Sequence, residues 1–467
     1  MPDLSGFVAA LGDVPTIADP ALVKRKSRDM TGAFSPVMKR ELADKFADVI
    51  VSPRTRQDVL RIASAAARHR MPLIARGGGT ANFGQGIPLQ GGAIVDMTGL
   101  KEIVWIKDSK VRAQSGAILS DIDSATRPLG WELRMHSSTK RAATLGGYVG
   151  GGHAGVGSCV YGILRDRGNI LGLEVVSIEE DPKIVELRGD EVNLVHHAYG
   201  TNGLIMELEM PLAPAWPWME AIVLFDEFMP SIRFAQSLAT SDGIVKKLIS
   251  ISSWPIPGMI KPLQPHVQAG KSMVLCLIAA PFFETFEVLV GEHGGIISYR
   301  CPEGEGAYGC PLYEFSWGHT RFHVNKSDPA IVSVIGLFCS DDPVADIARS
   351  HRRFAHLPGM HFEVKRFDHR LGFQGSPYFR YESDDQLAEV MRGLSDDGAM
   401  IANSHTFLVK EGGMKSVGDA DLAFKRRMDP HGLMNPGKMS LEGADKSESS
   451  GAALTGEGWK YRPTKAA

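Results

Sequence analysis

The feature that most constrains this chain is a glycine-dense loop between two short apolar runs. The loop spans 76–88, reads Arg-Gly-Gly-Gly-Thr-Ala-Asn-Phe-Gly-Gln-Gly-Ile-Pro, and lies between the apolar runs 73–75 and 93–95. Glycine accepts positive φ and leaves backbone amides uncovered, so such a loop can wrap closely around an anion. Arg76 adds a guanidinium fork that suits phosphate oxygens. Taken alone, the loop fits either a pyrophosphate cradle or an ordinary glycine-rich hairpin loop.

A second glycine-dense segment lies further along the chain, at 144–158. Gly150, Gly152 and Gly155 satisfy G-x-G-x-x-G there, but that fingerprint requires a strand before it and a helix after it. Gly155 and Gly157 disfavour such a helix, and the acidic residue at a suitable distance, Glu174, falls inside an apolar strand-like run. We therefore predict a second stretch of close-approach backbone rather than a nicotinamide-type Rossmann turn. Two such stretches fit one extended ligand, such as a pyrophosphate joined to large aromatic groups.

The first loop follows a predicted βαβ unit. Residues 48–51 and 73–75 read as strands, and Thr55 with Asp58 forms a capping box for the helix between them. The loop then lies at the carboxyl end of the second strand, where open α/β sheets bind ligands. Further strands are predicted at 94–96, 102–106, 110–114 and 170–176, with a helix at 118–127. The segment 199–207 is also expected to turn into a strand, which ends at 211–214.

A change of composition at 213–218, Ala-Pro-Ala-Trp-Pro-Trp, indicates a domain junction. Beyond it, strand-like and helix-like segments alternate, which is typical of an α+β domain with helices covering one face of a sheet. We expect strands at 222–225, 273–279, 295–299, 331–338 and 360–367, and helices at 231–240 and 384–394.

Charge and cysteine content narrow the class of protein. The 51 Lys and Arg residues nearly balance the 54 Asp and Glu residues, for a net charge of −3. This gives no electrostatic preference for nucleic acid or an anionic membrane. We expect no transmembrane segment, because no apolar run approaches the roughly 20 residues that one needs, and no secretion signal. The five cysteines form no C-x-x-C pair, so we expect reduced thiols in a cytoplasmic protein.

Four blocks together resemble the vanillyl-alcohol-oxidase type of FAD-linked oxidoreductases, which includes p-cresol methylhydroxylase and D-lactate dehydrogenases. The blocks are 76–86, 144–162, 200–205 and 435–438, and they follow the order and approximate spacing of that family. The resemblance covers roughly 48–214 and the C-terminal block. It implies an α+β fold: a two-part FAD-binding PCMH-type domain plus an α+β substrate (cap) domain with an antiparallel sheet.

The expected domains follow these blocks. An N-terminal helical segment, in which Leu4, Phe7, Val8 and Leu11 mark a docking helix, precedes the FAD-binding PCMH-type domain. The cap domain comes next, then a return to the FAD domain and a polar tail that we expect to be disordered. The expected bounds are 1–40 for the N-terminal segment, 41–215 for the FAD-binding domain, 216–415 for the cap, 416–440 for the return and 441–467 for the tail.

The resemblance also implies how FAD is held. Residues 76–80 would hold the pyrophosphate, 144–147 would line the flavin ring and ribityl chain, and the backbone of Ile205 would meet the adenine half. Thr80 stands where many members carry a flavin-linked His, and 137–139 contains no Cys for a second linkage. We therefore expect non-covalent FAD. The expected cofactor-binding residues are Arg76, Gly77, Gly78, Gly79, Thr80, Ala81, Gly84, Gln85, Ser137, Thr139, Thr144, Gly146, Gly147, Gly150, Gly151, Gly155, Ser158, Gly203, Ile205, Asn435 and Lys438.

The cap offers catalytic candidates in a polar-aromatic segment, 313–323, and near His405. His319 and His323 would share a helix face and could bind a metal, but a bare His-x-x-x-His pair lacks the context of a zinc motif, so we predict no metal. Each candidate has an ordinary alternative: a hydrogen-bonded histidine, a strand-end cap or a solvated strand arginine. His196 and His197 are expected on a surface helix. The catalytic or substrate-binding candidates are His405, His319, Tyr313 and Arg380.

These features predict an FAD-dependent oxidase or dehydrogenase that acts on a CH–OH or CH–NH group. The substrate would be a small alcohol, phenolic alcohol or 2-hydroxy acid that loses a hydride to the flavin. Such a site needs a base near the hydroxyl, and a cation or hydrogen-bond donors for a carboxylate or phenolate. Oxygen, a cytochrome or a quinone could accept the electrons, and the chain could form a homodimer. The alternatives are a non-catalytic flavin- or nucleotide-binding module and a zinc enzyme.

Overall fold

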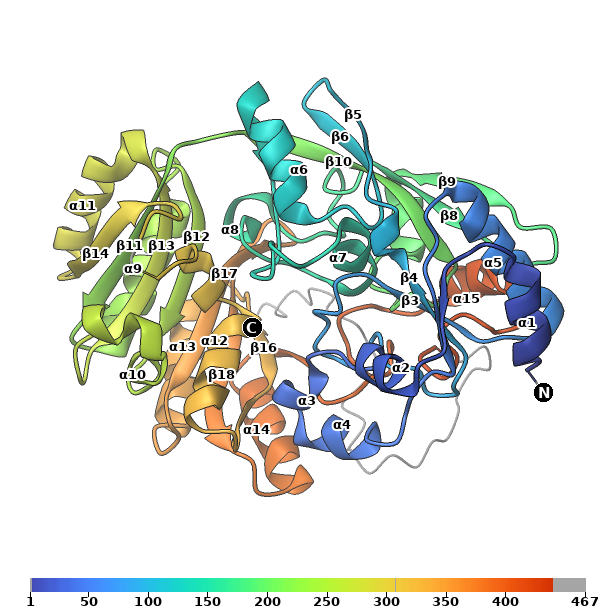
Figure 1. Cartoon of the computed structure of the whole chain (residues 1–467). Helices are drawn as coiled ribbons and strands as arrows, with labels where there is room; N and C mark the ends of the chain where they lie inside the picture. The colour runs from blue at the N-terminus through green and yellow to red at the C-terminus, as the bar shows by residue number, and fades with distance from the viewer. Residues whose placement is uncertain (1, 307, 440–467) are drawn as a thin grey trace. The chain divides into compact units, whose positions relative to one another are not determined.

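The computed structural model describes residues 2–306 and 308–439 (Figure 1). The tail expected at 441–467 lies outside the described residues. The chain divides into two compact units. In the described residues, unit 1 contains 2–153, 164–214 and 405–439, and unit 2 contains 154–163, 215–306 and 308–404.

The first sheet of unit 1 contains the predicted βαβ unit. Strands β2 (Val49–Val51) and β3 (Leu73–Arg76) both pair in parallel with β4 (Ala93–Asp96), and β1 (Thr16–Ile17) pairs antiparallel with β2. Helix α5 (Arg56–His69) joins β2 to β3 and begins at the predicted capping box. The glycine loop therefore leaves β3 at its carboxyl end, beside β4.

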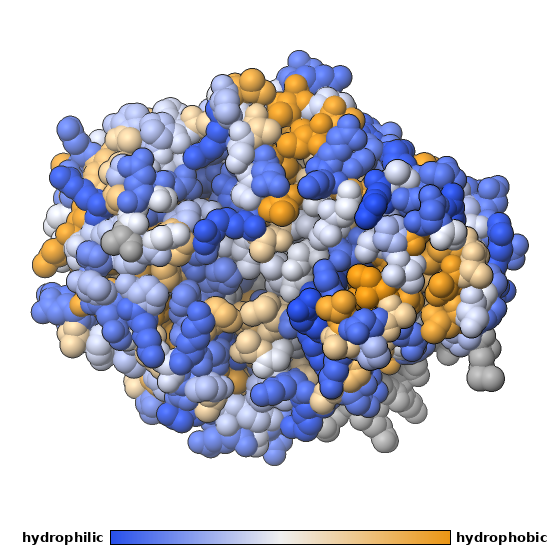
Figure 2. Space-filling model, in the orientation of Figure 1, coloured by the Kyte–Doolittle hydropathy of each residue, from blue (hydrophilic) through white to orange (hydrophobic). Residues whose placement is uncertain are grey.

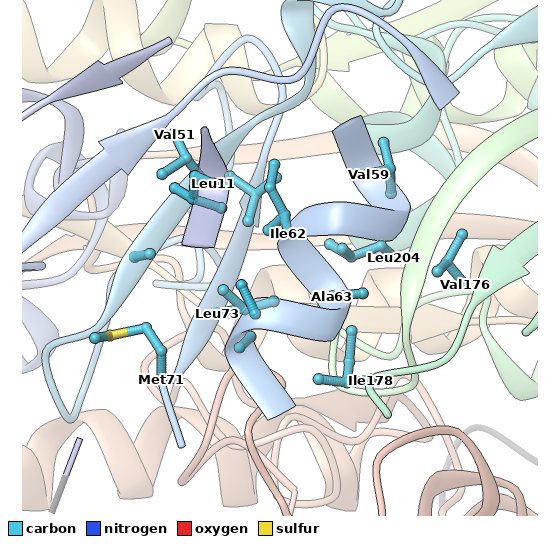
Figure 3. Packing of buried hydrophobic residues seen from close by; sticks show 14 of the residues in the cluster. Leu11, Val51, Val59, Ile62, Ala63, Met71, Leu73, Val176, Ile178 and Leu204 are labelled. Atoms are coloured by element: carbon cyan, nitrogen blue, oxygen red, sulfur yellow. The ribbon is translucent and has the colours of Figure 1, made fainter. Parts of the chain in front are cut away.

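The second sheet of unit 1 is antiparallel, in the order β5-β6-β10-β8-β9, with β7 paired to β10. One buried apolar cluster joins it to the first sheet. Figure 3 shows Val59, Ile62 and Ala63 of α5 in this cluster, together with Leu73 of β3 and Leu204 of β10. The strands are β5 (Ile103–Lys107), β6 (Lys110–Gln114), β7 (Trp131–Leu133), β8 (Gly172–Val176), β9 (Ile184–Arg188) and β10 (Leu204–Pro214).

Helices complete unit 1. The predicted docking helix α1 (Leu4–Leu11) is present, and its buried Phe7 and Leu11 join the same cluster as α5. The other helices are α2 (Pro20–Lys26), α3 (Thr31–Phe34), α4 (Pro36–Glu41), α6 (Leu119–Thr126), α7 (Leu145–Gly151) and α15 (Asp419–Met428).

Unit 2 is built on one antiparallel sheet, in the order β14-β11-β13-β12-β17-β18-β16-β19, with β15 paired to β18. This confirms the expected α+β fold with an antiparallel sheet. The strands are β11 (Trp218–Phe225), β12 (Lys246–Ser252), β13 (Ser272–Ala279), β14 (Ile296–Pro302), β15 (Ile331–Ser333), β16 (Ile335–Phe338), β17 (Met360–Phe367), β18 (Arg370–Arg380) and β19 (Met400–Ala402). The helices are α8 (Ser158–Tyr161), α9 (Phe228–Thr240), α10 (Ile256–Met259), α11 (Phe283–Glu292), α12 (Gly318–Ser327), α13 (Pro343–Arg353) and α14 (Asp384–Asp396).

The two faces of this sheet differ. Helix α9 packs on the face that carries Phe225 and Phe362, because Phe234 and Phe228 of α9 contact those rings. Successive strand residues point to opposite faces, so His361 and Glu363 lie on the other face. That second face therefore places polar side chains inside unit 2.

Several sequence predictions were wrong in detail. The strands β12 and β18 and the helices α11 and α13 were missed, and the strand expected at 331–338 is two strands. His196 and His197 do not lie on a surface helix: both are buried, after a 3₁₀ turn (Gly189–Leu194), and His197 has a φ of +51°. A helix also follows Gly155: α8 begins directly after Gly157, whose φ of +100° lets it precede the helix rather than enter it.

Figure 2 shows apolar residues in separate groups among polar ones on the face it presents. Across the part of the chain that the structure describes, no helix combines the length and apolar character that crossing a bilayer requires.

Candidate functional site

The two glycine segments touch each other in unit 1. A Cβ atom on Gly77 would lie 2.0 Å from Thr144 Oγ1, and one on Gly78 would lie 1.9 Å from the carbonyl oxygen of Ala142. Gly79 has a φ of +70°. Among the described residues, the amides of Gly77, Gly78 and Gly79 donate to no acceptor. The loop therefore excludes side chains and keeps consecutive backbone donors available for a ligand.

Helix α7 presents the second segment to this loop. Thr144 caps the helix, with its Oγ1 accepting from Gly147 N at 3.3 Å. Gly146 N donates to Ser115 O at 2.8 Å, and a Cβ atom there would lie 2.5 Å from Ser115 Cβ. Glycine at 146 is thus required by packing against Ser115, the residue after β6, whereas Gly147 is exposed.

Arg76 stands at the start of the loop. Its Nη1 donates to Arg28 O at 2.8 Å, while its Nε is buried and has no hydrogen-bond partner in the described residues. Burial lowers the pKa of the guanidinium, and Asp29 and Asp96 oppose that shift. An orphaned buried donor beside free amides is what a bound phosphate would satisfy.

The C-terminal block holds the loop from behind. Lys438 Nζ donates to Gly84 O at 2.6 Å, and Asn435 Nδ2 donates to Gln85 O at 2.8 Å and to Tyr199 O at 2.6 Å. Gln85 Nε2 in turn donates to Gly151 O at 3.2 Å. Burial lowers the pKa of Lys438 to about 7. The donors of Asn435 and Lys438 are thus directed at the loop backbone and fix its shape.

A row of hydroxyl groups lies beside the loop. Thr139 Oγ1 lies 2.9 Å from Ser137 Oγ and 3.5 Å from Thr80 Oγ1. Met30 N donates to Ala81 O at 2.8 Å, so this hydrogen bond ties the loop to the segment before α3. The structure thus brings the residues predicted between 76 and 85 next to those predicted between 137 and 147.

The remaining predicted cofactor residues divide between the units. Gly150 contacts Ile205, whose Cδ1 would lie 3.5 Å from a Cβ atom on that glycine, and Gly203 has a φ of +103°. Gly151 lies on the same helix in unit 1. Gly155 and Ser158 belong to unit 2, where Gly155 N donates to Ser158 Oγ at 2.9 Å.

The catalytic candidates also lie in both units. His405 is buried in unit 1, and its Nδ1 lies 2.9 Å from Ser35 Oγ, the cap of α4. In unit 2, His319 lies on α12 with Nδ1 3.0 Å from Glu314 O, and burial lowers its pKa. Tyr313 is buried in an apolar cluster. Arg380 is exposed and pairs with Asp328 at 2.6 Å, which favours the solvated-strand interpretation.

Sequence reasoning missed a buried polar group on β12 and β17. Its members are Ser250, Ser252, His361 and Glu363. The alternation of His361, Glu363 and Lys365 with Phe362 and Val364 was the available signal, since it marks a strand with one polar and one apolar face. Arg321 of α12 is also buried, and burial lowers its pKa to about 10.

The positions of the potential metal-ligating side chains in the described residues do not support a metal site. His319 and His323 lie four apart on α12, as one alternative required. Over residues 2–306 and 308–439, no three His, Cys, Asp or Glu side chains are placed to share a metal ion. All five cysteines are free thiols.

Comparison with known proteins finds a family model over the part of the chain that holds the glycine loops. A family model described as an FAD binding domain matches residues 47–188. Glycolate oxidase subunit GlcD of Bacillus subtilis is 28% identical over 178 residues, 36% of this chain and 37% of that protein. D-2-hydroxyglutarate dehydrogenase of Escherichia coli is 32% identical over 166 residues, 33% of this chain and 16% of that protein. The chain thus spans less than half the length of either relative.

Solved structures match over nearly the whole chain. Alkyldihydroxyacetonephosphate synthase has a TM-score of 0.67 at 15% identity, over 93% of this chain and 85% of that one. Physcomitrella patens BBE-like 1, as a variant, has a TM-score of 0.63 at 12% identity, over 94% of this chain and 100% of that one. At these identities, the likeness shows a shared fold.

Proposed function

Because this chain carries an FAD-binding domain of the PCMH type, homologous to that of GlcD, we propose that it is an FAD-dependent oxidoreductase that oxidises a small CH–OH compound. One observation carries the proposal. The two glycine segments meet in unit 1, and they leave three consecutive amides and the Arg76 Nε without a partner in the described residues. A dinucleotide pyrophosphate would supply the missing acceptors.

Different residues of unit 1 are proposed to bind different parts of FAD. The amides of 77–79 and Arg76 would hold the pyrophosphate, and the Thr144–Gly147 turn with the hydroxyls of Ser137 and Thr139 would lie along the flavin and its ribityl chain. Bound flavin would supply the two-electron redox chemistry. Thr80 cannot form a histidyl linkage, so we propose non-covalent FAD.

We propose a 2-hydroxy acid as the first substrate class to test, since the names of two relatives, glycolate oxidase subunit GlcD and D-2-hydroxyglutarate dehydrogenase, specify such acids. Alcohols, phenolic alcohols and amines are the wider class. His319 is our proposed hydrogen-bond acceptor for the substrate. Its Nδ1 is occupied by Glu314 O, and the lowered pKa keeps the ring neutral at pH 7. His405 and Tyr313 are proposed as further catalytic or substrate-binding residues.

The partners are proposals of the same kind. The reduced flavin needs an electron acceptor, which could be oxygen, a cytochrome or a quinone. A homodimer has one structural support: Val288 and Ile296, 62% and 58% exposed, lie on α11 and on the edge strand β14. The five free thiols suit the cytoplasm, which we propose as the location.

Purification and anaerobic reduction test the proposal. We expect a yellow protein that releases its colour into the supernatant on acid precipitation. One of glycolate, D-lactate, D-2-hydroxyglutarate and 4-hydroxybenzyl alcohol should bleach the flavin without oxygen. A colourless protein would overturn the proposal. A yellow protein that no alcohol, hydroxy acid or amine reduces would favour the non-catalytic flavin module, and stoichiometric zinc by elemental analysis would favour the metal alternative.

A further inference from the structure

A cavity of about 390 Å³ lies within unit 2, where α9 begins and α13 ends. Its walls come from the first residues of α9, the last turn of α13, the residues that follow β12, and the starts of β13 and β17. All of these residues belong to unit 2. Small-molecule sites have volumes of roughly 300–1,000 Å³, so this cavity is large enough for a small organic ligand.

Aromatic rings form much of the wall. Phe228, the first residue of α9, contacts the ring of His351 with centroids 4.9 Å apart and stacks on Phe362 of β17 at 6.1 Å. These contacts fix the position of the Phe228 ring. Trp254 also lines the cavity but stays 38% exposed, and its ring packs on Gly258, where a Cβ atom would lie 2.7 Å away. The cavity therefore offers one fixed, buried ring and one accessible ring to a ligand.

His351 is a polar group of the wall that carries no charge. It lies on α13, is half-buried, and makes no hydrogen bond to another described residue. Burial lowers the pKa of His351, with a smaller contribution from Arg352. At pH 7 the ring is thus neutral, with one nitrogen as donor and the other as acceptor.

Two consecutive carboxylates, Asp226 and Glu227, supply the charge. They are the charged residues among those that line the cavity. Asp226 pairs with Lys271 at 2.5 Å, which offsets its charge. Glu227 is exposed, and its side chain makes no hydrogen bond or ion pair with the described residues, although it stands at the N-cap of α9. One uncompensated negative charge therefore lies at this cavity.

The helix ends add to this field. The carboxyl end of α13, at its C-cap Phe354, carries a partial negative charge beside the cavity. The amino end of α9 carries a partial positive charge, but Glu227 and Asp226 stand at that end and oppose it. The cavity as a whole thus favours a cation over an anion.

We propose that this cavity binds a small organic cation, a primary ammonium group joined to an aromatic ring. Glu227 accepts a hydrogen bond from the ammonium group, and the acceptor nitrogen of His351 is close enough in the wall to serve as a second acceptor. Trp254 and Phe228 pack on the aromatic body, and the face of Trp254 also attracts the positive charge. The site lies within unit 2 and does not depend on the flavin proposed for unit 1.

Calorimetry with a simple probe tests the ligand class. The purified full chain would be titrated at neutral pH with 2-phenylethylamine, with 2-phenylethanol as the neutral analogue, and with 3-phenylpropanoate as the anionic one. We expect the amine to bind at least about tenfold more tightly than the alcohol, and the anion to bind most weakly. No detectable binding of the amine at about 10 mM, or equal affinities for amine and alcohol, would overturn the proposal.

Three variants test the location. Glu227→Gln keeps the size of the side chain but removes its charge, so the affinity for the amine should fall about five- to tenfold while that for the alcohol stays the same. Trp254→Ala should weaken both ligands about tenfold. Glu292→Gln is the matched control, because Glu292 is an exposed carboxylate of α11 outside the cavity wall, and it should change neither affinity. An amine that binds Glu227→Gln and Trp254→Ala as tightly as the wild type is bound elsewhere, which would contradict the assignment.

Discussion

The glycine loop of unit 1 and the polar sheet face of unit 2 leave hydrogen-bonding groups without partners in opposite ways. The loop works by the absence of side chains: Gly77 and Gly78 leave no room for a Cβ atom, and their amides are the donors. The sheet face works by side chains that are present but incompletely paired, with Glu363 as the centre. The difference teaches that one candidate site is recognised from missing side chains, whereas the other is recognised from a buried oxygen without a partner in the described residues.

The largest expected effect comes from adding one methyl group to the loop. Gly78→Ala places a Cβ atom 1.9 Å from Ala142 O, so the two glycine segments must separate. We expect FAD affinity to fall at least several-hundredfold, measured from the flavin-to-protein absorbance ratio during dialysis. Gly86→Ala is the matched control, because a Cβ atom there meets nothing within 4 Å. Equal FAD retention in the two variants would contradict the view that the loop binds FAD because it lacks side chains.

The next effect separates the two buried glutamates of unit 2. Burial raises the pKa of Glu220 from 4.5 to about 7. Between these values the folded state holds a proton that the unfolded state has lost, so this group's contribution to stability falls as pH rises. In the wild type, this group should lower the free energy of unfolding by roughly 2–3 kcal/mol as the pH rises from 4.5 to 7. Glu220→Gln should abolish that decrease, as measured by urea unfolding across the same pH range. A wild type and variant with parallel pH profiles would show that Glu220 does not titrate there.

A smaller effect is expected from His319. With Nδ1 held by Glu314 O, its second nitrogen is our proposed acceptor for substrate, so His319→Ala should slow anaerobic flavin reduction about tenfold with FAD retained. Arg380→Ala, at an exposed residue paired with Asp328, serves as the control and should leave the rate unchanged. If Arg380 proves the more sensitive position, the carboxylate of the substrate is bound at that strand end instead.

The smallest effect concerns a single cap. Thr144→Ala removes the hydroxyl that caps α7 and should lower stability by about 1 kcal/mol, seen as a reduced urea midpoint. Thr144→Ser should restore most of the loss. A full loss in both variants would indicate that the methyl group against Gly77 matters more than the hydrogen bond.

Prediction from sequence succeeded where local rules decide the outcome. The capping box at Thr55 and Asp58 and the strands around the glycine loop depend on neighbours in sequence, and the structure confirms them. The polar face failed because it depends on distant pairing: Ser250 and Glu363 are 113 residues apart, and β12 was not recognised as a strand. The backbone at Trp317 could not be foreseen either, since positive φ at a tryptophan is imposed by its surroundings.

The hold of Lys438 and Asn435 on the loop has a consequence for biosynthesis. Gly84 and Gln85 emerge from the ribosome early, yet the groups that fix their carbonyls come more than 340 residues later, at separations of 354 and 350. A nascent or truncated polypeptide lacking these two residues has a cradle without its rear support. Loading of the dinucleotide should therefore be a late step of maturation, and it would discriminate finished molecules from unfinished ones.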